Sequence, residues 1–112
     1  MFGSNKRVAQ TMARAVFNDV VIAESDDVKV VEGITYFPVA DVDMDRLAES
    51  PTRTRCFWKG QASYFHVDGD DDTALDAAFR YATPWPLARR LVTDRIGFWR
   101  DVTIDGLSLI HI

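Results

Sequence analysis

The sequence has 112 residues, of which 47% are hydrophobic and 27% are charged, and these values are ordinary for one globular domain. Its formal net charge of −4 argues against a general nucleic-acid binder, because such proteins carry a basic excess. One cysteine and two histidines exclude an internal disulfide and the usual zinc sites. We therefore expect a cytoplasmic protein that needs no metal or cofactor and binds no nucleic acid.

The chain carries no sign of a membrane or export segment. No run approaches the roughly 18 apolar residues of a membrane span, and the N-terminus lacks the apolar core of a signal peptide. Residues 1–12 have no clear hydrophobic period, which indicates a flexible tail. Residues 13–112 are expected to form a single β-rich domain.

Short apolar runs alternate with turn-forming residues along most of the chain. Residues 14–23 predict a hairpin, because Asn18-Asp19 at their centre tolerates positive φ. Further strand-like runs, rich in β-branched and aromatic residues, lie at residues 28–32, 35–37, 55–58, 62–67, 95–99 and 102–104. The turns between them are expected at residues 33–34, 59–61, 68–72 and 100–101. This pattern predicts a meander of antiparallel strands.

Three segments depart from the strand pattern. Residues 41–48 predict a short helix that begins at Asp41 and ends before Ser50-Pro51. Residues 87–92, after the rigid corner at Pro84-Trp85-Pro86, predict a second one. Residues 76–81 fit helical and strand periodicity equally, so periodicity alone leaves both open.

Several motifs follow one another in a characteristic order and together carry a family resemblance. They are Val30-Val31-Glu32-Gly33 with Tyr36-Phe37-Pro38, Asp41-Val42, Thr54-Arg55-Cys56-Phe57-Trp58-Lys59-Gly60 with Ala62-Ser63-Tyr64, Ala77-Ala78-Phe79 with Tyr81, and the proline corner ahead of Ile96-Gly97-Phe98-Trp99. Over about residues 15–104 the chain resembles the bacterial and fungal domain of unknown function 427 family, which is labelled nucleotidyltransferase-like. Phe57 stands where that family usually has proline, and Phe79 where it usually has tryptophan.

The resemblance implies a fold but no reaction. It implies a compact, mainly β domain of antiparallel strands, a small barrel or β-tent with one or two short helices, and it favours a strand at residues 76–81. Nucleotidyl transfer finds no support in the residues themselves, because the sequence has no glycine-rich phosphate loop and no aspartate pair in a metal-binding context.

A basic stretch in an acidic chain is the strongest pointer to a binding site. Arg53, Arg55 and Lys59 lie within seven residues, and no acidic residue lies between residues 50 and 67. On a strand, Arg53 and Arg55 project to one face, where two guanidinium groups can hold a carboxylate or phosphate. The alternative is an ordinary solvated strand, since edge strands commonly carry basic residues.

Aromatic residues can supply the walls of a cleft beside these cations. Tyr36, Trp58, Tyr64 and Trp85 are the candidates, with Trp85 favoured for exposure because it lies between two prolines. The alternative is that these rings pack in the core or at corners. Glu32, at a strand end near Tyr36, completes the candidate ligand-binding set.

Three functions therefore compete. The first is binding of a small anionic ligand in a basic and aromatic cleft. The second is an enzyme that uses Cys56, His66 or Glu32 in the same cleft, with Cys56 as nucleophile or His66 as general base. The third is a protein-interaction or homodimerisation module that presents its aromatic strands. The sequence names no ligand or reaction and leaves open whether the protein is an enzyme.

Overall fold

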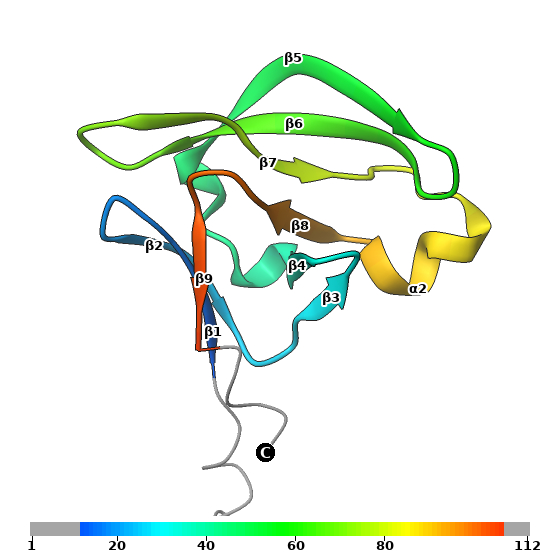
Figure 1. The fold of residues 1–112 in the computed structure, drawn as a ribbon, viewed down its shortest axis with the longest axis horizontal. Helices are drawn as coiled ribbons and strands as arrows, with labels where there is room; N and C mark the ends of the chain where they lie inside the picture. Colours follow the sequence, from blue (N-terminus) through cyan, green and yellow to red (C-terminus); the bar gives the residue numbers. More distant parts are fainter. Residues whose placement is uncertain (1–11, 107–112) are drawn as a thin grey trace, which may run out of the picture.

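The structure, a computed structural model, describes residues 12–106 and has nine β-strands and one short α-helix over that range (Figure 1). The strands are β1 (Ala13–Phe17), β2 (Val20–Ser25), β3 (Lys29–Val31), β4 (Ile34–Pro38), β5 (Leu47–Cys56), β6 (Gly60–Asp68), β7 (Thr73–Arg80), β8 (Arg95–Phe98) and β9 (Thr103–Asp105). The helical segments are the 3-10 helices η1 (Val39–Asp41), η2 (Met44–Arg46) and η3 (Pro86–Ala88) and the α-helix α2 (Arg89–Val92). The predicted tail lies outside the described residues, apart from Met12.

The strands form two antiparallel sheets. The smaller sheet has the order β2-β1-β9, and the larger has the order β3-β4-β8-β7-β6-β5. Each sheet keeps two edge strands, so the sheets pack together without closing into a true barrel. The prediction of a mainly β antiparallel domain is confirmed, and the closed-barrel form of that prediction is not what the strands adopt.

Two tight turns follow directly from their residues. Asn18 and Asp19 have φ values of 54° and 64° and join β1 to β2, as predicted. Glu32 and Gly33 have φ values of 54° and 81° and join β3 to β4. Two successive positive φ values are the requirement of a type I′ hairpin turn, whose twist matches that of the flanking strands.

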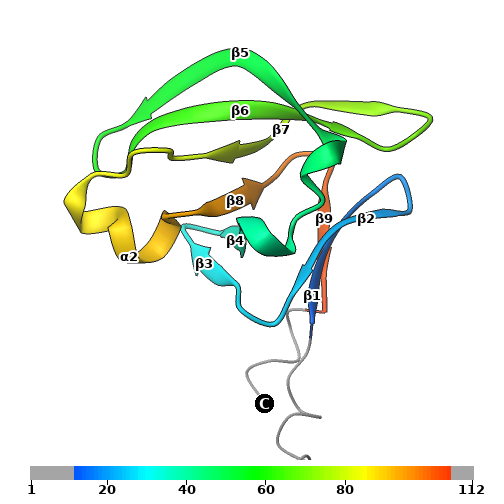
Figure 2. The ribbon, with the colours of Figure 1, turned by 180° about the vertical axis from the view of Figure 1, so that it is seen from behind.

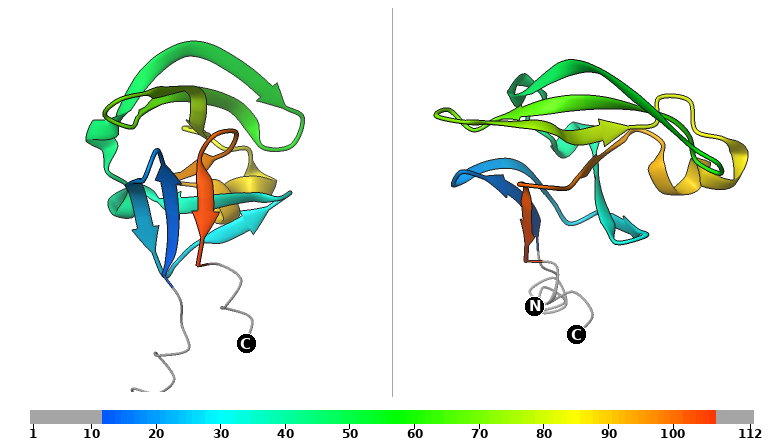
Figure 3. Two further views of the ribbon diagram at one scale, coloured as in Figure 1. Left: turned by 60° about the vertical axis from the view of Figure 1, so that its left-hand side comes forward. Right: turned by 45° about the horizontal axis from the view of Figure 1, so that its top comes forward.

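Apolar clusters cover both faces of the larger sheet. Phe37 and Phe98 pack in a cluster that includes residues of the smaller sheet, whereas Tyr36 packs in a second cluster with Val92 of α2. Because side chains alternate along a strand, the neighbours Tyr36 and Phe37 reach opposite faces. Figures 1 and 2 show the smaller sheet at one end of the larger sheet and α2 at the other. The two further views in Figure 3 show the same separation.

Residues 76–81, ambiguous in sequence, continue β7 to Arg80. Ala78 packs in the first cluster and Phe79 in the second, so both faces of β7 are buried at this point. A strand buried on both faces loses the alternation of apolar and polar residues. This double burial explains why periodicity could not separate strand from helix there.

The helix predicted at residues 41–48 does not form as one element. The chain instead makes the two separate turns η1 and η2, and Leu47 already pairs with Val67 in β5. Val42 lies between the turns with extended backbone and bridges Ala23, while the N–H of Asp43 donates to the carbonyl of Ile22 at 2.8 Å. Pairing with β2 therefore overrides the local helical pattern.

Ser50-Pro51, expected to end a helix, lies inside β5. The register between β5 and β6 is interrupted between Glu49 and Arg53, and β5 is an edge strand. A proline is tolerated at such a position because no partner strand needs its missing N–H. The turn after β5 also falls earlier than predicted: it covers residues 57–59, and β6 begins at Gly60. The short helix predicted at residues 87–92 is confirmed as η3 and α2.

Candidate functional site

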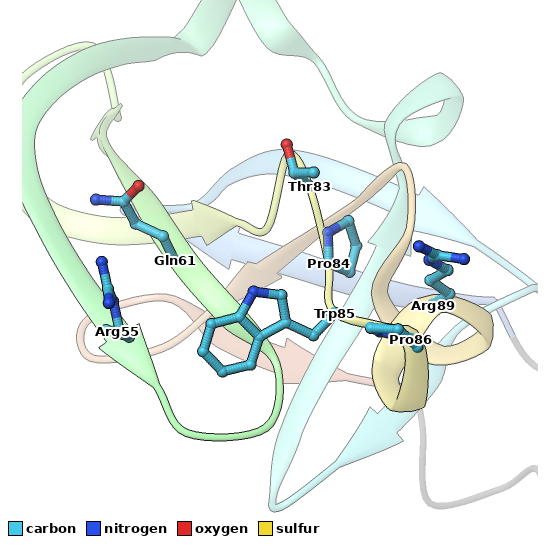
Figure 4. A pocket seen from close by; sticks show the side chains of 7 residues that line it. All are labelled: Arg55, Gln61, Thr83, Pro84, Trp85, Pro86 and Arg89. Carbon is cyan, nitrogen blue, oxygen red and sulfur yellow. The ribbon is translucent and has the colours of Figure 1, made fainter.

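An open cleft lies between the β5–β6 hairpin and the segment that leads into α2. Its volume is about 350 Å³, and Figure 4 shows the residues that line it: Arg55, Gln61, Thr83, Pro84, Trp85, Pro86 and Arg89. Arg55 and Gln61 face each other as register partners on β5 and β6. In Figure 4 the indole of Trp85 lies between this strand pair and Arg89.

The position of Trp85 follows from the local sequence. Its backbone is extended (φ −70°, ψ 159°), as expected of a residue before proline. Its N–H donates to the carbonyl of Lys59 at 3.1 Å, and its own carbonyl accepts from the N–H of Ala88 at 2.9 Å. Gly60 allows the close approach, because a Cβ there would lie 3.4 Å from the carbonyl oxygen of Thr83 and 3.5 Å from Cδ1 of Trp85. The corner is thus fixed to the start of β6.

The cleft carries positive charge that the protein does not neutralise nearby. Arg55 and Arg89 are both exposed, and within residues 12–106 neither guanidinium forms an ion pair. The side chains of Gln61 and Thr83 add uncharged hydrogen-bonding groups. Trp85, 40% exposed, contributes an accessible aromatic surface. This combination suits an anion that has an apolar group attached.

Arg53 lines a neighbouring cleft instead of the one around Arg55. Its guanidinium donates to the backbone carbonyls of Ser50 and Thr52, both at 2.8 Å. The second cleft has a volume of about 320 Å³ and is lined by Glu49, Ser50, Arg53, Ser63, Tyr64, Phe65, Arg80 and Ala82. The structure therefore places the two predicted arginines on successive sections of β5.

Lys59 lies away from both clefts and is buried, with only 5% of its surface exposed. Its ammonium pairs with the carboxylate of Glu32 at 2.5 Å and lies over the rings of Trp58 and Tyr81 at 5.3 and 5.6 Å. The hydrogen bond from Lys59 is the largest cause that lowers the pKa of Glu32, and the indole of Trp58 donates to the same carboxylate at 3.4 Å. Glu32, Trp58 and Lys59 thus join two turns.

Tyr36 and Tyr64 belong to the second apolar cluster. Tyr36 is fully buried, and this burial raises its pKa above the ordinary tyrosine value. Burial likewise raises the pKa of Tyr81 to about 12. The hydroxyl of Tyr64 lies 2.8 Å from that of Thr54, and its ring packs against Phe79. Of these rings only Tyr64 lines a cleft, the second one, and Tyr36 is a core residue.

The three candidates for catalysis do not share one cleft. Cys56, a half-buried free thiol at the end of β5, packs beside the second cluster. His66 lies near the other end of β6, about 20 Å along the strand from Gly60, the register partner of Cys56. There Nδ1 of His66 accepts a hydrogen bond from the N–H of Asp76 at 3.1 Å. Glu32, as described above, is held by Lys59.

The sequence predicts Arg55 and Trp85 as site residues but not Gln61, Thr83 and Arg89. Gln61 could have been inferred from hairpin pairing with Arg55, had the turn been placed at residues 57–59. Arg89 carries a weaker signal: it begins α2 directly after the proline corner. Only the tertiary packing of that corner on β6 brings Arg89 to the cleft.

No three metal-ligating side chains come together within residues 12–106. Over the same range, none of the helical segments has the length and apolar character to span a lipid bilayer. The acidic loop at residues 69–72 forms local hydrogen bonds. For example, the N–H of Asp70 donates to the carboxylate of Asp68 at 2.9 Å.

The fold and site define a small antiparallel β domain with an open cleft of arginine and tryptophan. The family model NTP_transf_9, described as a domain of unknown function (DUF427), matches residues 6–107. The chain therefore belongs to the DUF427 family, as its motifs predict. A comparison with curated proteins found no match.

Proposed function

We propose that the protein binds a small anionic ligand in the cleft formed by Arg55, Arg89 and Trp85. The observation that carries the proposal is the pair of guanidinium groups that have no ion-pair partner among residues 12–106 and line the same cleft. A guanidinium can donate two parallel hydrogen bonds to one carboxylate or phosphate group. Two such groups, with the amide of Gln61, can surround an anion on more than one side.

The electrostatic setting supports an anion rather than a cation. The chain as a whole has a formal net charge of −4, yet the residues that line this cleft include two arginines and no acidic residue. A local positive field in an acidic protein raises the local concentration of anions. Because the cleft is open, this field is screened by salt, and binding should weaken as ionic strength rises.

The aromatic wall supports a ligand with an apolar part. Pro84, Trp85 and Pro86 form one side of the cleft, and Trp85 is 40% exposed. Ligand sites commonly combine such surfaces with a few polar groups that fix orientation. A flat ring on the ligand can pack against the indole while its anionic group meets the arginines.

Calorimetric titration with phenyl phosphate and inorganic phosphate tests the proposal. We expect phenyl phosphate to bind more tightly, because its ring adds contact with Trp85. Arg55→Ala should weaken binding by about tenfold, the loss of one charge-assisted interaction at an open site. Arg55→Lys should also weaken it, though by less, because the planar fork is lost while the charge is kept.

Arg90→Ala provides the matched control. Arg90 is an exposed neighbour of Arg89 on α2 and does not line the cleft, so its removal changes the net charge equally. The affinity of this variant should stay within about twofold of that of the unsubstituted protein, because salt screens the effect of a charge that lies outside the cleft. Equal affinities for the unsubstituted protein and both Arg55 variants would contradict the proposal.

A second candidate function is contact with another protein chain, including a second copy. Phe57 and Leu87 are 88% and 82% exposed, and each lies two residues from a cleft residue, Arg55 and Trp85. The hydrogen bond from Trp85 to Lys59 joins the two segments that carry these side chains, and contiguous exposed apolar surface marks interaction sites. Sedimentation equilibrium of the unsubstituted protein and of Phe57→Ser would show whether the chain self-associates through this edge. We place either function in the cytoplasm, where the free thiol of Cys56 stays reduced.

A further inference from the structure

Successive register pairs of β5 and β6 line the two clefts. Arg53 is paired with Ser63 across β5 and β6, and Arg55 with Gln61 two residues further on. The first pair lines the second cleft and the second pair lines the first. Residues two apart on a strand project to the same face, so the clefts are successive sections of one surface. The segment after β7 also lines both clefts: Ala82 lines the second cleft, and the next residue, Thr83, lines the first.

This surface is the part of the sheet face that the smaller sheet leaves uncovered. Phe65 and Ala78 are register partners on β6 and β7 and pack in the cluster shared with the smaller sheet. The next pair on the same face is Ser63 with Arg80, and both residues line the open second cleft. The face therefore changes from apolar and covered to polar and open toward the α2 end.

The second cleft contains hydrogen-bond donors that the protein uses incompletely. Nε of Arg80 is buried without a hydrogen-bond partner among the described residues. The one ion pair that Arg80 forms in that range is with Asp94, at 3.8 Å, and the carboxylate of Asp94 is 83% exposed. An ion pair with so long a distance and so exposed a partner contributes little to stability. The guanidinium of Arg80, the hydroxyl of Ser63 and the guanidinium of Arg53 are thus placed to meet an anionic group.

We propose that the two clefts form one groove for an elongated ligand with two anionic groups, one at Arg55 and Arg89 and the other at Arg53 and Arg80. The inference rests on the proposed function, because it extends the same anion site along the sheet. Two residues along a strand span about 7 Å, so the anionic groups are separated by a short chain of atoms. The ligand class is therefore an oligophosphate or an extended dicarboxylate rather than a single phosphate.

Glu49 limits the groove at its far end. It lines the second cleft and is the register partner of Phe65. This pair follows that of Arg53 with Ser63 on the side away from Arg55. A carboxylate there repels a third anionic group that extends further along β5. Replacement by glutamine should consequently tighten the binding of a long polyanion while leaving that of phenyl phosphate unchanged.

The test compares phenyl phosphate with inorganic tripolyphosphate by calorimetry on the full chain. Arg80→Gln and Arg53→Gln should each weaken tripolyphosphate binding by about tenfold and change phenyl phosphate binding less than twofold. Arg55→Gln should weaken the binding of both ligands. Arg53 is exposed, so its variant keeps the test decisive if Arg80→Gln fails to fold, as judged by a thermal melt. Arg90→Gln is again the control for net charge.

The outcomes separate this inference from the proposed function. If phenyl phosphate binding depends on Arg55, and tripolyphosphate binding is indifferent to Arg53 and Arg80, the groove is overturned while the single site stands. If neither ligand responds to Arg55→Gln, the proposed function fails. In that case the two-site groove fails with it, even where tripolyphosphate still responds to Arg53 and Arg80.

Discussion

The backbone N–H of Trp85 donates to the carbonyl oxygen of Lys59 at 3.1 Å, and this bond joins the two walls of the cleft. Trp85 belongs to the proline corner, and Lys59 to the turn between β5 and β6. The side chain of Lys59 points the other way, to Glu32. One turn residue thus holds the cleft wall through its backbone and the β3–β4 turn through its charge.

Gly60→Ala should damage both stability and the cleft. Gly60 has φ of +109°, and an added Cβ would lie 3.4 Å from the carbonyl of Thr83. The strained backbone should lower the free energy of unfolding by about 1–2 kcal/mol, and displacement of Trp85 should weaken phenyl phosphate binding. Gly33→Ala is the control, because Gly33 has φ of +81° with nothing within 4 Å. Chemical denaturation and calorimetry of both variants check this: the control should lose stability without losing affinity, and equal affinity losses would refute the account.

Glu32→Gln should lower the melting temperature more than Lys59→Met does. The first change leaves the buried ammonium of Lys59 without its counter-charge, whereas the second leaves a carboxylate that is 57% exposed and remains hydrated. Methionine also keeps an unbranched apolar side chain next to Trp58 and Tyr81. Thermal melts at pH 7 provide the comparison. A lower melting temperature for Lys59→Met would mean that the contacts of the ammonium with the rings dominate over its pairing.

The stability contributed by Asp76 should depend on pH. Neighbouring hydroxyl groups lower the pKa of Asp76: that of Ser50 contributes most, and that of Thr52 donates to the carboxylate at 2.8 Å. Because the pKa is lower in the folded than in the unfolded protein, this stability is present above about pH 4 and is lost as pH falls through the folded value. Asp76→Asn removes the charge but tolerates the observed φ of 53°.

Denaturant unfolding of both proteins between pH 2 and 7 tests this. The variant should be less stable at pH 7, and the difference should shrink below about pH 4. A difference that stays constant across the range would assign the effect to hydrogen-bond geometry rather than to the charge.

Cys56→Ser should leave ligand binding intact. The thiol packs beside the second apolar cluster and lines neither cleft. Stability should fall modestly, because a half-buried hydroxyl needs a hydrogen-bond partner more than a thiol does. Isothermal titration and a thermal melt measure the two effects. A folded variant that has lost an activity of the unsubstituted protein would revive Cys56 as a nucleophile.

Local chemistry determined the parts of the fold that the sequence could predict. Asn18-Asp19 needs no tertiary contact to favour its turn, and the runs around Tyr36 and Ile96 read as strands from their side chains alone. The single helix predicted at residues 41–48 does not form, because Val42 and Asp43 bond to β2, which is distant in the sequence.

The site was only partly predictable for a related reason. Arg55 and Trp85 could be recognised because a cation cluster and a rigid corner are visible in sequence. The burial of Lys59 could not be predicted from the sequence, because its partner Glu32 lies 27 residues away along the chain. The separation of Arg53 from Arg55 into two clefts depends on the proline corner, whose residues line the cleft of Arg55 but not that of Arg53, and the sequence does not show where this corner packs.

The most direct test of the cleft is a nitrogen–proton correlation spectrum recorded during titration with phenyl phosphate. The three tryptophans give separate indole N–H signals, and Trp85→Phe assigns one of them. The indoles of Trp58 and Trp99 are engaged by Glu32 and by the carbonyl of Asp76, away from the cleft. We predict a saturable shift of the Trp85 signal with the other two signals unchanged. Saturable shifts of Trp58 or Trp99, with the Trp85 signal unmoved, would contradict it.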